Sequence, residues 1–157
     1  MARKVVIGCG NPLAGDDGIG LRVIEELTRR GLPPEVKAIP AGLPGLTILG
    51  FLRGAQQAII VDAADARQEP GTIICCQEKD LAKLPFRSLS LHGIGLVEAL
   101  ALGRLVEPAA FPPRLTFVAI QIGEIKLGSQ SLSPPVAAAL PAAVEAVYQL
   151  LEGGPCA

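Results

Sequence analysis

Aromatic side chains, histidine and net charge are all scarce in this sequence of 157 residues. Trp is absent, the aromatic share is 3%, and 50% of the residues are apolar. The core must therefore be built from Val, Ile, Leu and Ala, a composition that suits an aliphatic sheet covered by helices. A chain of this length fits one domain, and we expect residues 1–157 to form a single domain.

Basic runs and long apolar runs are also missing. The formal net charge is -1, and no basic stripe interleaved with aromatic side chains occurs, so nucleic acid is not an expected partner. No segment approaches the ~20 apolar residues of a membrane span. The apolar run that follows Lys4 is too short for a secretory leader. The sequence therefore predicts a soluble, cytoplasmic protein without a membrane partner.

The four cysteines do not have the spacing of a metal site or a disulfide framework. They are Cys9, the adjacent Cys75 and Cys76, and Cys156, with no C-x-x-C pair. Free cysteine is among the most often buried side chains. We therefore expect Cys9, Cys75 and Cys76 to be small buried residues of strands, with neither a disulfide framework nor a zinc site.

Hydrophobic periodicity predicts alternating strands and helices in the first part of the chain. The expected elements are a strand at 4–9, a helix at 17–30 closed by Gly31, a strand at 35–39, a helix at 44–53 and an uninterrupted apolar strand at 57–62. This β-α-β-α-β order favours a parallel sheet with right-handed crossovers.

The later elements complete the predicted sheet. They are a strand at 71–77, a helix at 92–103, a strand at 115–122 and a helix at 133–152. The turn at 66–70 is too short for a crossover helix, so the strand after it should pair antiparallel. Pro141 should kink the last helix or mark where its regular part begins. The sequence thus predicts a single three-layer α/β domain: a five-stranded, mostly parallel twisted sheet with one antiparallel strand and helices on both faces.

The glycine-rich segment from Gly8 to Gly20 carries two adjacent carboxylates, Asp16 and Asp17, where a helix should begin. A dinucleotide fingerprint needs a third glycine where this chain has Leu13, and two carboxylates would repel a pyrophosphate. Nucleotide binding is therefore disfavoured. The two acids could cap the helix, because carboxylates accept the free N–H groups of a first turn. The other interpretation is a cation site.

Two further residues could share that site. Asp62 follows the buried apolar strand, at the edge of an open α/β sheet where ligand sites gather. Its role there could instead be no more than a hydrogen bond to a neighbouring loop amide. His92, the only histidine, precedes an apolar helix and can reach the same edge, although a lone histidine is more often structural. With Asp17 these side chains form an O,O,N set that suits Zn or Ni better than Mg or Ca.

Three motifs together resemble the hydrogenase maturation endopeptidases, which process the large subunit of nickel-iron hydrogenases. The motifs are Gly8-x-Gly10-Asn11-x-Leu13-x-x-Asp16-Asp17-x-Ile19-Gly20, Ile60-Val61-Asp62-Ala63 and Ser90-x-His92-x-x-Gly95-Leu96. The resemblance implies that Asp17, Asp62 and His92 contact metal. It also implies a protease that removes a C-terminal extension from the large-subunit precursor after nickel insertion. Nickel then belongs to the substrate and serves recognition, and is not a permanent cofactor.

The resemblance also suggests a mechanism and two substrate-facing loops. We expect Asp17 to act as base and orient a water for attack on the peptide carbonyl. A protein-bound Zn or Ni acting as Lewis acid is the less favoured alternative. Asn11 and Gly42 should lie in the substrate-facing loops. The family usually has an Asp-Gly-Gly-like segment at the second loop, whereas this chain has Pro40-Ala41-Gly42, so the identity of the partner hydrogenase stays open.

Two other functions fit parts of the sequence. The chain could be a non-catalytic module that checks nickel in the precursor, or chaperones it, without cutting it. It could also be a Rossmann-like domain that binds a small molecule, although the acidic helix entry argues against this. The sequence leaves the oligomeric state open, and we expect a monomer.

Overall fold

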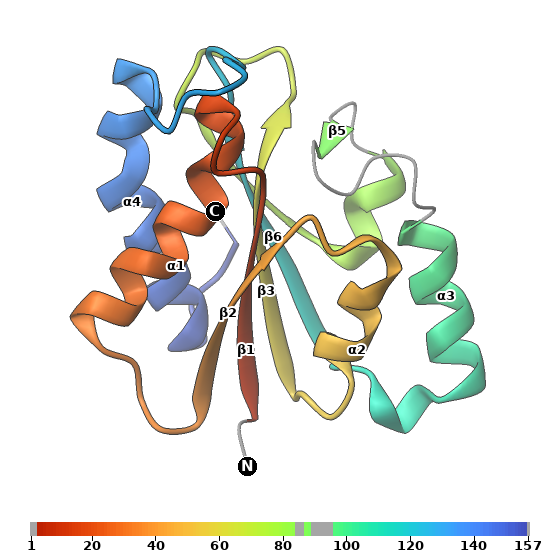
Figure 1. Ribbon diagram of the computed structural model, residues 1–157. Helices are drawn as coiled ribbons and strands as arrows, with labels where there is room; N and C mark the ends of the chain where they lie inside the picture. Colours follow the sequence, from red (N-terminus) through yellow and green to blue (C-terminus); the bar gives the residue numbers. More distant parts are fainter. Residues whose placement is uncertain (1–2, 84–86, 89–95, 157) are drawn as a thin grey trace.

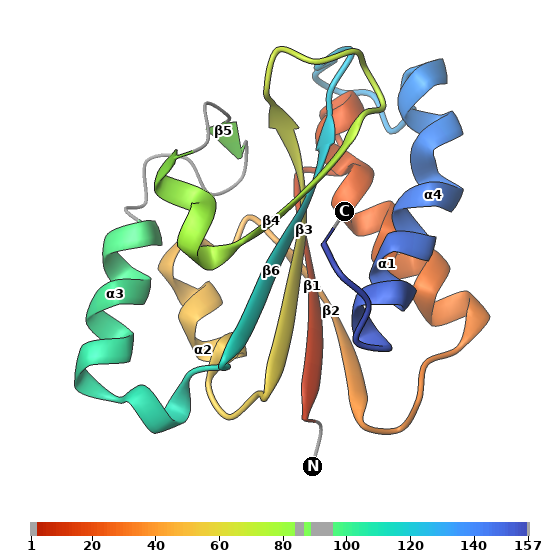
Figure 2. The same ribbon diagram turned by 180° about the vertical axis from the view of Figure 1, so that it is seen from behind.

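The computed structural model describes residues 3–83, 87–88 and 96–156. Its main sheet has the strand order β2-β1-β3-β6-β4, seen from opposite sides in Figures 1 and 2. The strands are β1 (Lys4–Cys9), β2 (Val36–Gly42), β3 (Gln57–Asp65), β4 (Ile73–Gln77) and β6 (Arg114–Gln121). All are parallel except β4, which pairs antiparallel with β6. The predicted fold is confirmed, with the two-residue β5 (Arg87–Ser88) added antiparallel to β3.

Helices cover both faces of the sheet (Figure 1). The helices α1 (Ile19–Arg30) and α4 (Pro134–Leu151) lie on one face, and α2 (Ile48–Leu52) and α3 (Leu96–Val106) lie on the other. Short 3-10 turns complete the chain: η1 (Gly15–Gly18), η2 (Gly45–Thr47), η3 (Glu78–Lys83) and η4 (Pro108–Ala110). Gly31 ends α1 with a positive φ of 95°, as the sequence predicts.

Side-chain alternation along the strands divides the core into two clusters. Val6 and Ile59 pack in one cluster with residues of α1 and α4, whereas Ile7 and Ile60 pack in the other with residues of α2 and α3. The central strand β3 is buried at eight of its nine residues, which explains the uninterrupted apolar run at its centre, Ala58-Ile59-Ile60-Val61. Helices thus cover both faces of the sheet, and the edge formed by the carboxyl ends of its parallel strands is the place left for a site.

Several boundaries differ from the predicted ones. β3 continues past Asp62 to Asp65 because this stretch keeps pairing with β6, so Asp62 lies within the strand. The helix expected at 44–53 is divided into η2 and the short α2. Of the helix expected at 92–103, residues 92–95 lie outside the described residues, and α3 continues to Val106. Pro141 lies inside α4, which is one helix on both sides of it.

The helix α4 is the one helix of the described residues that is long and apolar enough to cross a membrane, by length and composition alone. The sequence-based expectation that no segment approaches a membrane span therefore does not hold for α4. However, a core helix passes the same test. Val144 and Val147 are fully buried, and α4 packs against α1 and β6. Its place is that of a covering helix of the sheet.

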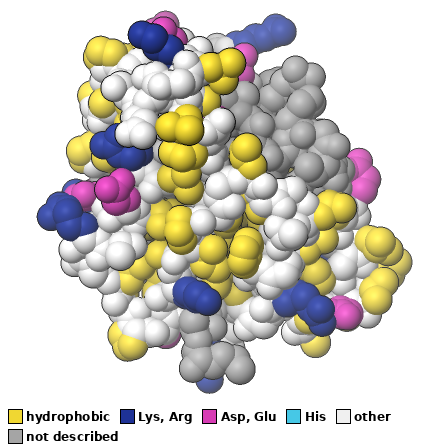
Figure 3. Space-filling model, viewed as in Figure 1, with side chains coloured by type: hydrophobic (Ala, Val, Ile, Leu, Met, Phe, Trp, Pro, Cys, Tyr) yellow, Lys and Arg dark blue, Asp and Glu magenta, His cyan; other side chains and the backbone are white. Residues whose placement is uncertain are grey.

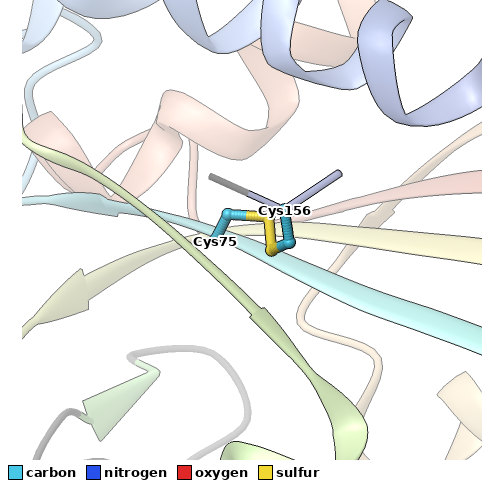
Figure 4. The surroundings of a disulfide bond; sticks show 2 residues. All are labelled: Cys75 and Cys156. Atoms are coloured by element: carbon cyan, nitrogen blue, oxygen red, sulfur yellow. A yellow bond between two sulfur atoms is a disulfide. The ribbon is translucent and has the colours of Figure 1, made fainter. Parts of the chain in front are cut away.

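A disulfide joins Cys75 of β4 to Cys156, in the segment that follows α4 (Figure 4). The expectation of no disulfide is wrong for this pair. The two residues are separated by 81 positions, so their sequence spacing gives no sign that their Cα atoms lie 5.5 Å apart. Cys9 and Cys76 are free and buried, as predicted. Disulfides are rare in the cytosol of mesophiles, so this bond gives no support to the expected cytoplasmic location.

We expect the unfolded protein to react with iodoacetamide at two of its four cysteines, Cys9 and Cys76, when no reductant is present. Sulfurs in a disulfide have no thiolate to alkylate. Peptide mapping by mass spectrometry identifies the modified residues, and prior reduction should raise the number to four. Alkylation of Cys75 or Cys156 without reduction would contradict the disulfide.

Candidate active site

Asp62 and Cys9 occupy neighbouring positions on β3 and β1. The register pairs Gly8 with Val61, so the next residues along the two parallel strands are Cys9 and Asp62. By strand alternation both side chains point to the face covered by α2. Both are buried, with exposures of 0% for Cys9 and 4% for Asp62. The N–H of Ala63 donates to Asp62 Oδ1 over 2.9 Å.

Asp17 reaches this place from η1, the turn between β1 and α1. The backbone passes so close that a Cβ on Gly10 would lie 1.9 Å from the carbonyl oxygen of Asp17, and Gly10 has a φ of 137°. Only glycine fits there. The N–H of Asn11 donates to Asp17 Oδ2 over 3.0 Å. The buried Asp17 Oδ1 has no hydrogen-bond partner among the residues that the structure describes.

The electrostatics tie these three side chains to one site. Burial raises the pKa of the Asp17 carboxyl group, and the hydrogen bond from Asn11 offsets only part of this effect. Burial also raises the pKa of the Cys9 thiol, and the negative charges of Asp62 and Asp17 raise it further. Both carboxylates therefore act on the same neutral thiol. The structure thus brings Asp17 and Asp62 together, while their roles stay predictions.

The third predicted metal ligand, His92, lies outside the described residues. Within the described ranges, no three His, Cys, Asp or Glu side chains are grouped in a way that could hold a metal ion. The unpartnered oxygen of Asp17 and the neighbouring Asp62 supply oxygen donors that fit two of the three predicted ligands. The three-ligand set therefore remains a prediction.

Asp16 is fully buried and binds the loop that follows β6. Its Oδ2 accepts the N–H groups of Gly123 (2.8 Å) and Glu124 (2.7 Å), and also the hydroxyl of Ser133 (2.7 Å). Its Oδ1 accepts the N–H of Ser133 over 2.7 Å. Burial alone would raise the pKa of Asp16, but these hydrogen bonds outweigh it and lower the pKa. The helix-cap interpretation is wrong for Asp16, since its partners are over a hundred residues away and no side chain caps η1 or α1.

The two loops expected to face substrate meet beside Asp17. The N–H of Gly10 donates to the carbonyl of Gly42 over 2.8 Å, and Gly42 has a φ of +65°. The side-chain oxygen of Asn11 accepts the N–H of Leu13 over 2.9 Å and so fixes the first loop. Pro40 lies in the edge strand β2, where a missing N–H is tolerated. Contact of Asn11 and Gly42 with substrate stays a prediction.

The sequence pattern does not identify Cys9 as a member of this site, because it predicts only a small buried strand residue there. A signal was available. The strands expected at 4–9 and 57–62 have equal lengths, and pairing them from their first residues places Cys9 beside Asp62. The observed register, Lys4 with Gln57, is this pairing.

Together, the fold, the buried Asp62 and the half-buried Asp17 define a three-layer α/β protein with an acidic site at the carboxyl edge of its sheet. The sequence model of one family, HycI, described as hydrogenase maturation protease, matches residues 21–150. This chain therefore belongs to the hydrogenase maturation protease family.

Individual relatives extend the similarity over nearly the whole chain. The hydrogenase expression/formation protein HupD of Rhodobacter capsulatus is 34% identical over 155 residues, which cover 97% of this chain and 73% of HupD. The hydrogenase 2 maturation protease of Escherichia coli K12 is 32% identical over 151 residues, covering 95% and 90% of the two chains. The structure of the hydrogenase maturating endopeptidase HybD from E. coli matches with a TM-score of 0.84 and 31% identity, covering 96% and 93%. The similarity therefore includes the segment before residue 21, where Asp17 lies.

Proposed function

We propose that this protein is an endopeptidase that removes the C-terminal extension of a nickel-iron hydrogenase large-subunit precursor. Membership of the maturation protease family supports the reaction class. One structural observation supports the assignment of its centre: Asp17 Oδ1 is buried and has no hydrogen-bond partner among the described residues. A carboxylate oxygen in that state can accept a proton from water.

In the proposed reaction Asp17 acts as the general base. The N–H of Asn11 holds Oδ2, so Oδ1 is left to take a proton from a water molecule. The resulting hydroxide attacks the carbonyl carbon of the scissile peptide bond, and Asp17 returns the proton to the departing nitrogen. Burial raises the pKa of Asp17 and so makes its carboxylate a stronger base. Asp62 and the neutral Cys9 thiol lie beside this carboxylate.

Nickel enters this proposal as part of the substrate. A nickel ion already bound by the precursor would meet oxygen ligands at Asp17 and Asp62, together with the imidazole of His92, a donor set that nickel accepts. Such a contact would hold the scissile bond next to Asp17. The protease then carries no nickel between encounters. A zinc or nickel ion held by the protein itself is the less favoured alternative.

We expect a nickel-loaded large-subunit precursor to lose its C-terminal peptide when mixed with this protein, whereas the nickel-free precursor stays intact. Intact-mass spectrometry measures the shortening. No shortening of either precursor would overturn the peptidase function. Shortening of both would keep the peptidase and remove the nickel requirement. Stable binding of the loaded precursor without shortening would favour a nickel-checking chaperone.

A further inference from the structure

Large apolar side chains are exposed on three loops around the candidate site. The loops follow β1, β2 and β6, whose carboxyl ends lie toward one end of the sheet, where η1 leads into α1 (Figure 1). We call these side chains the apolar rim: Leu13, Leu43, Leu46, Ile125 and Leu127. Exposures range from 43% for Ile125 to 83% for Leu127. Exposed apolar patches on the surface of a folded protein mark binding surfaces.

Backbone hydrogen bonds hold part of the rim in a fixed position. The N–H of Gly128 donates to the carbonyl of Leu13 over 2.7 Å, and Ala14 forms a β-bridge with Leu127. Asp16 ties the start of the same loop to η1. These side chains are therefore presented by an ordered backbone. Binding to them requires little further ordering of the loops, so less of the contact energy is lost.

A hollow of about 400 Å³ lies beside the loop that carries Leu13, between that loop and α1. Apolar parts of its wall come from Pro12, Leu21 and Leu132. Arg22 and Glu25 also line it and form an ion pair at 3.7 Å, so their charges offset each other. The hollow is large enough to receive an aliphatic side chain.

The charges near the rim are balanced in sign. Glu124 and Lys126 flank Ile125 in the loop that follows β6. Figure 3, drawn in the view of Figure 1, shows charged side chains of both signs at the top of the visible face, the end of the sheet where these loops lie. A surface of this kind has no field of one sign to attract a charged partner. It fits an uncharged, apolar one.

We propose that the apolar rim binds an extended, uncharged segment of the precursor that carries aliphatic side chains beside the scissile bond. This inference rests on the proposed function. A polypeptide whose carbonyl carbon comes within reach of Asp17 Oδ1 passes over the loops that carry the rim, so its side chains meet these leucines. Burial of aliphatic groups on both sides of the contact then supplies affinity. The rim selects the substrate by the polarity of this segment.

The test compares two charge insertions on equally exposed leucines. Leu127 in the rim and Leu105 on α3 are 83% and 80% exposed, so Leu127→Glu and Leu105→Glu should leave thermal unfolding unchanged. We expect Leu127→Glu to raise KM for the nickel-loaded precursor about tenfold with kcat unchanged, because it places a charge against buried aliphatic groups. Leu105→Glu should cleave like wild type. Leu127→Lys should weaken binding as Leu127→Glu does.

Binding of the same precursor, measured separately by calorimetry, distinguishes failure of the rim from failure of the peptidase. If the Leu127→Glu variant binds and cleaves the precursor as well as wild type does, the proposal for the rim is overturned and the peptidase function stands. Tighter binding by Leu127→Lys or Leu127→Glu would show a charged segment and also overturn it. If wild type binds the precursor without cutting it and Leu127→Glu weakens that binding, the rim stands and the peptidase fails. Absence of any binding by wild type overturns both.

Discussion

Replacing Asp17 by Asn should lower the rate of precursor cleavage by roughly 10²–10⁴-fold, the contribution typical of a general base. The amide oxygen of Asn can still accept the N–H of Asn11, so the local backbone keeps its hydrogen bond. Burial raises the pKa of Asp17, which means that its charged form costs stability in the folded state. The variant should therefore unfold at the same temperature as wild type or at a higher one.

A matched control and a pH profile test this role. Glu145→Gln removes an exposed carboxylate of α4 and should leave cleavage unchanged. In wild type, kcat/KM should rise with pH through the pKa of Asp17, because only the carboxylate can accept a proton. The midpoint of that rise should lie above the ordinary value of Asp, about 4. Cleavage by Asp17→Asn at more than about a tenth of the wild-type rate would contradict the role of base.

Replacing Asp16 by Ala should lower the free energy of unfolding by on the order of 3 to 5 kcal/mol. The N–H groups of Gly123, Glu124 and Ser133, which are only part-buried, lose their acceptor, and a fully buried donor left without one costs about 1–3 kcal/mol. Partial access of water to the loop reduces the sum. This loss is a large part of the 5–15 kcal/mol that holds a typical domain folded. Urea unfolding, followed by circular dichroism, measures it.

The pH dependence of this loss has a definite sign. The pKa of Asp16 is lowered in the folded state, so its stabilisation is present above the pKa of the unfolded chain, about 4, and is lost as the pH falls through the lower folded value. The difference in unfolding free energy between wild type and Asp16→Ala should therefore shrink below pH 4. A difference that stays constant in acid, or that is below about 1 kcal/mol at neutral pH, would contradict the assigned hydrogen bonds.

The two adjacent acids show where interpretation of the sequence reaches its limit. Both stand in the same turn, and first-turn capping was a reasonable expectation for either of them. In the structure Asp16 binds the loop at 123–133, whereas Asp17 turns toward β1 and β3. The partners of Asp16 are remote in sequence, so no local pattern could show that Asp16 binds a distant loop while Asp17 faces the candidate site.

What the sequence determined by itself is the α/β fold and the edge of the sheet at which the carboxylates meet. Apolar runs and helical periodicity are local properties, and they placed β1, α1 and β3 within a few residues. Glycine spacing is local as well. A Cβ on Gly20 would lie 2.3 Å from the carbonyl oxygen of Cys9, so the close approach of α1 to the sheet is encoded where the glycines stand.

Only the tertiary structure decided which side chains contact one another. It paired Cys75 with Cys156, placed Cys9 where the charges of both Asp17 and Asp62 act on its thiol, and gave Asp16 four donors from a distant loop. It also left the leucines of the apolar rim exposed around the site. These contacts join residues that are far apart in the chain. They depend on strand order, register and loop path, which no local pattern of residues specifies.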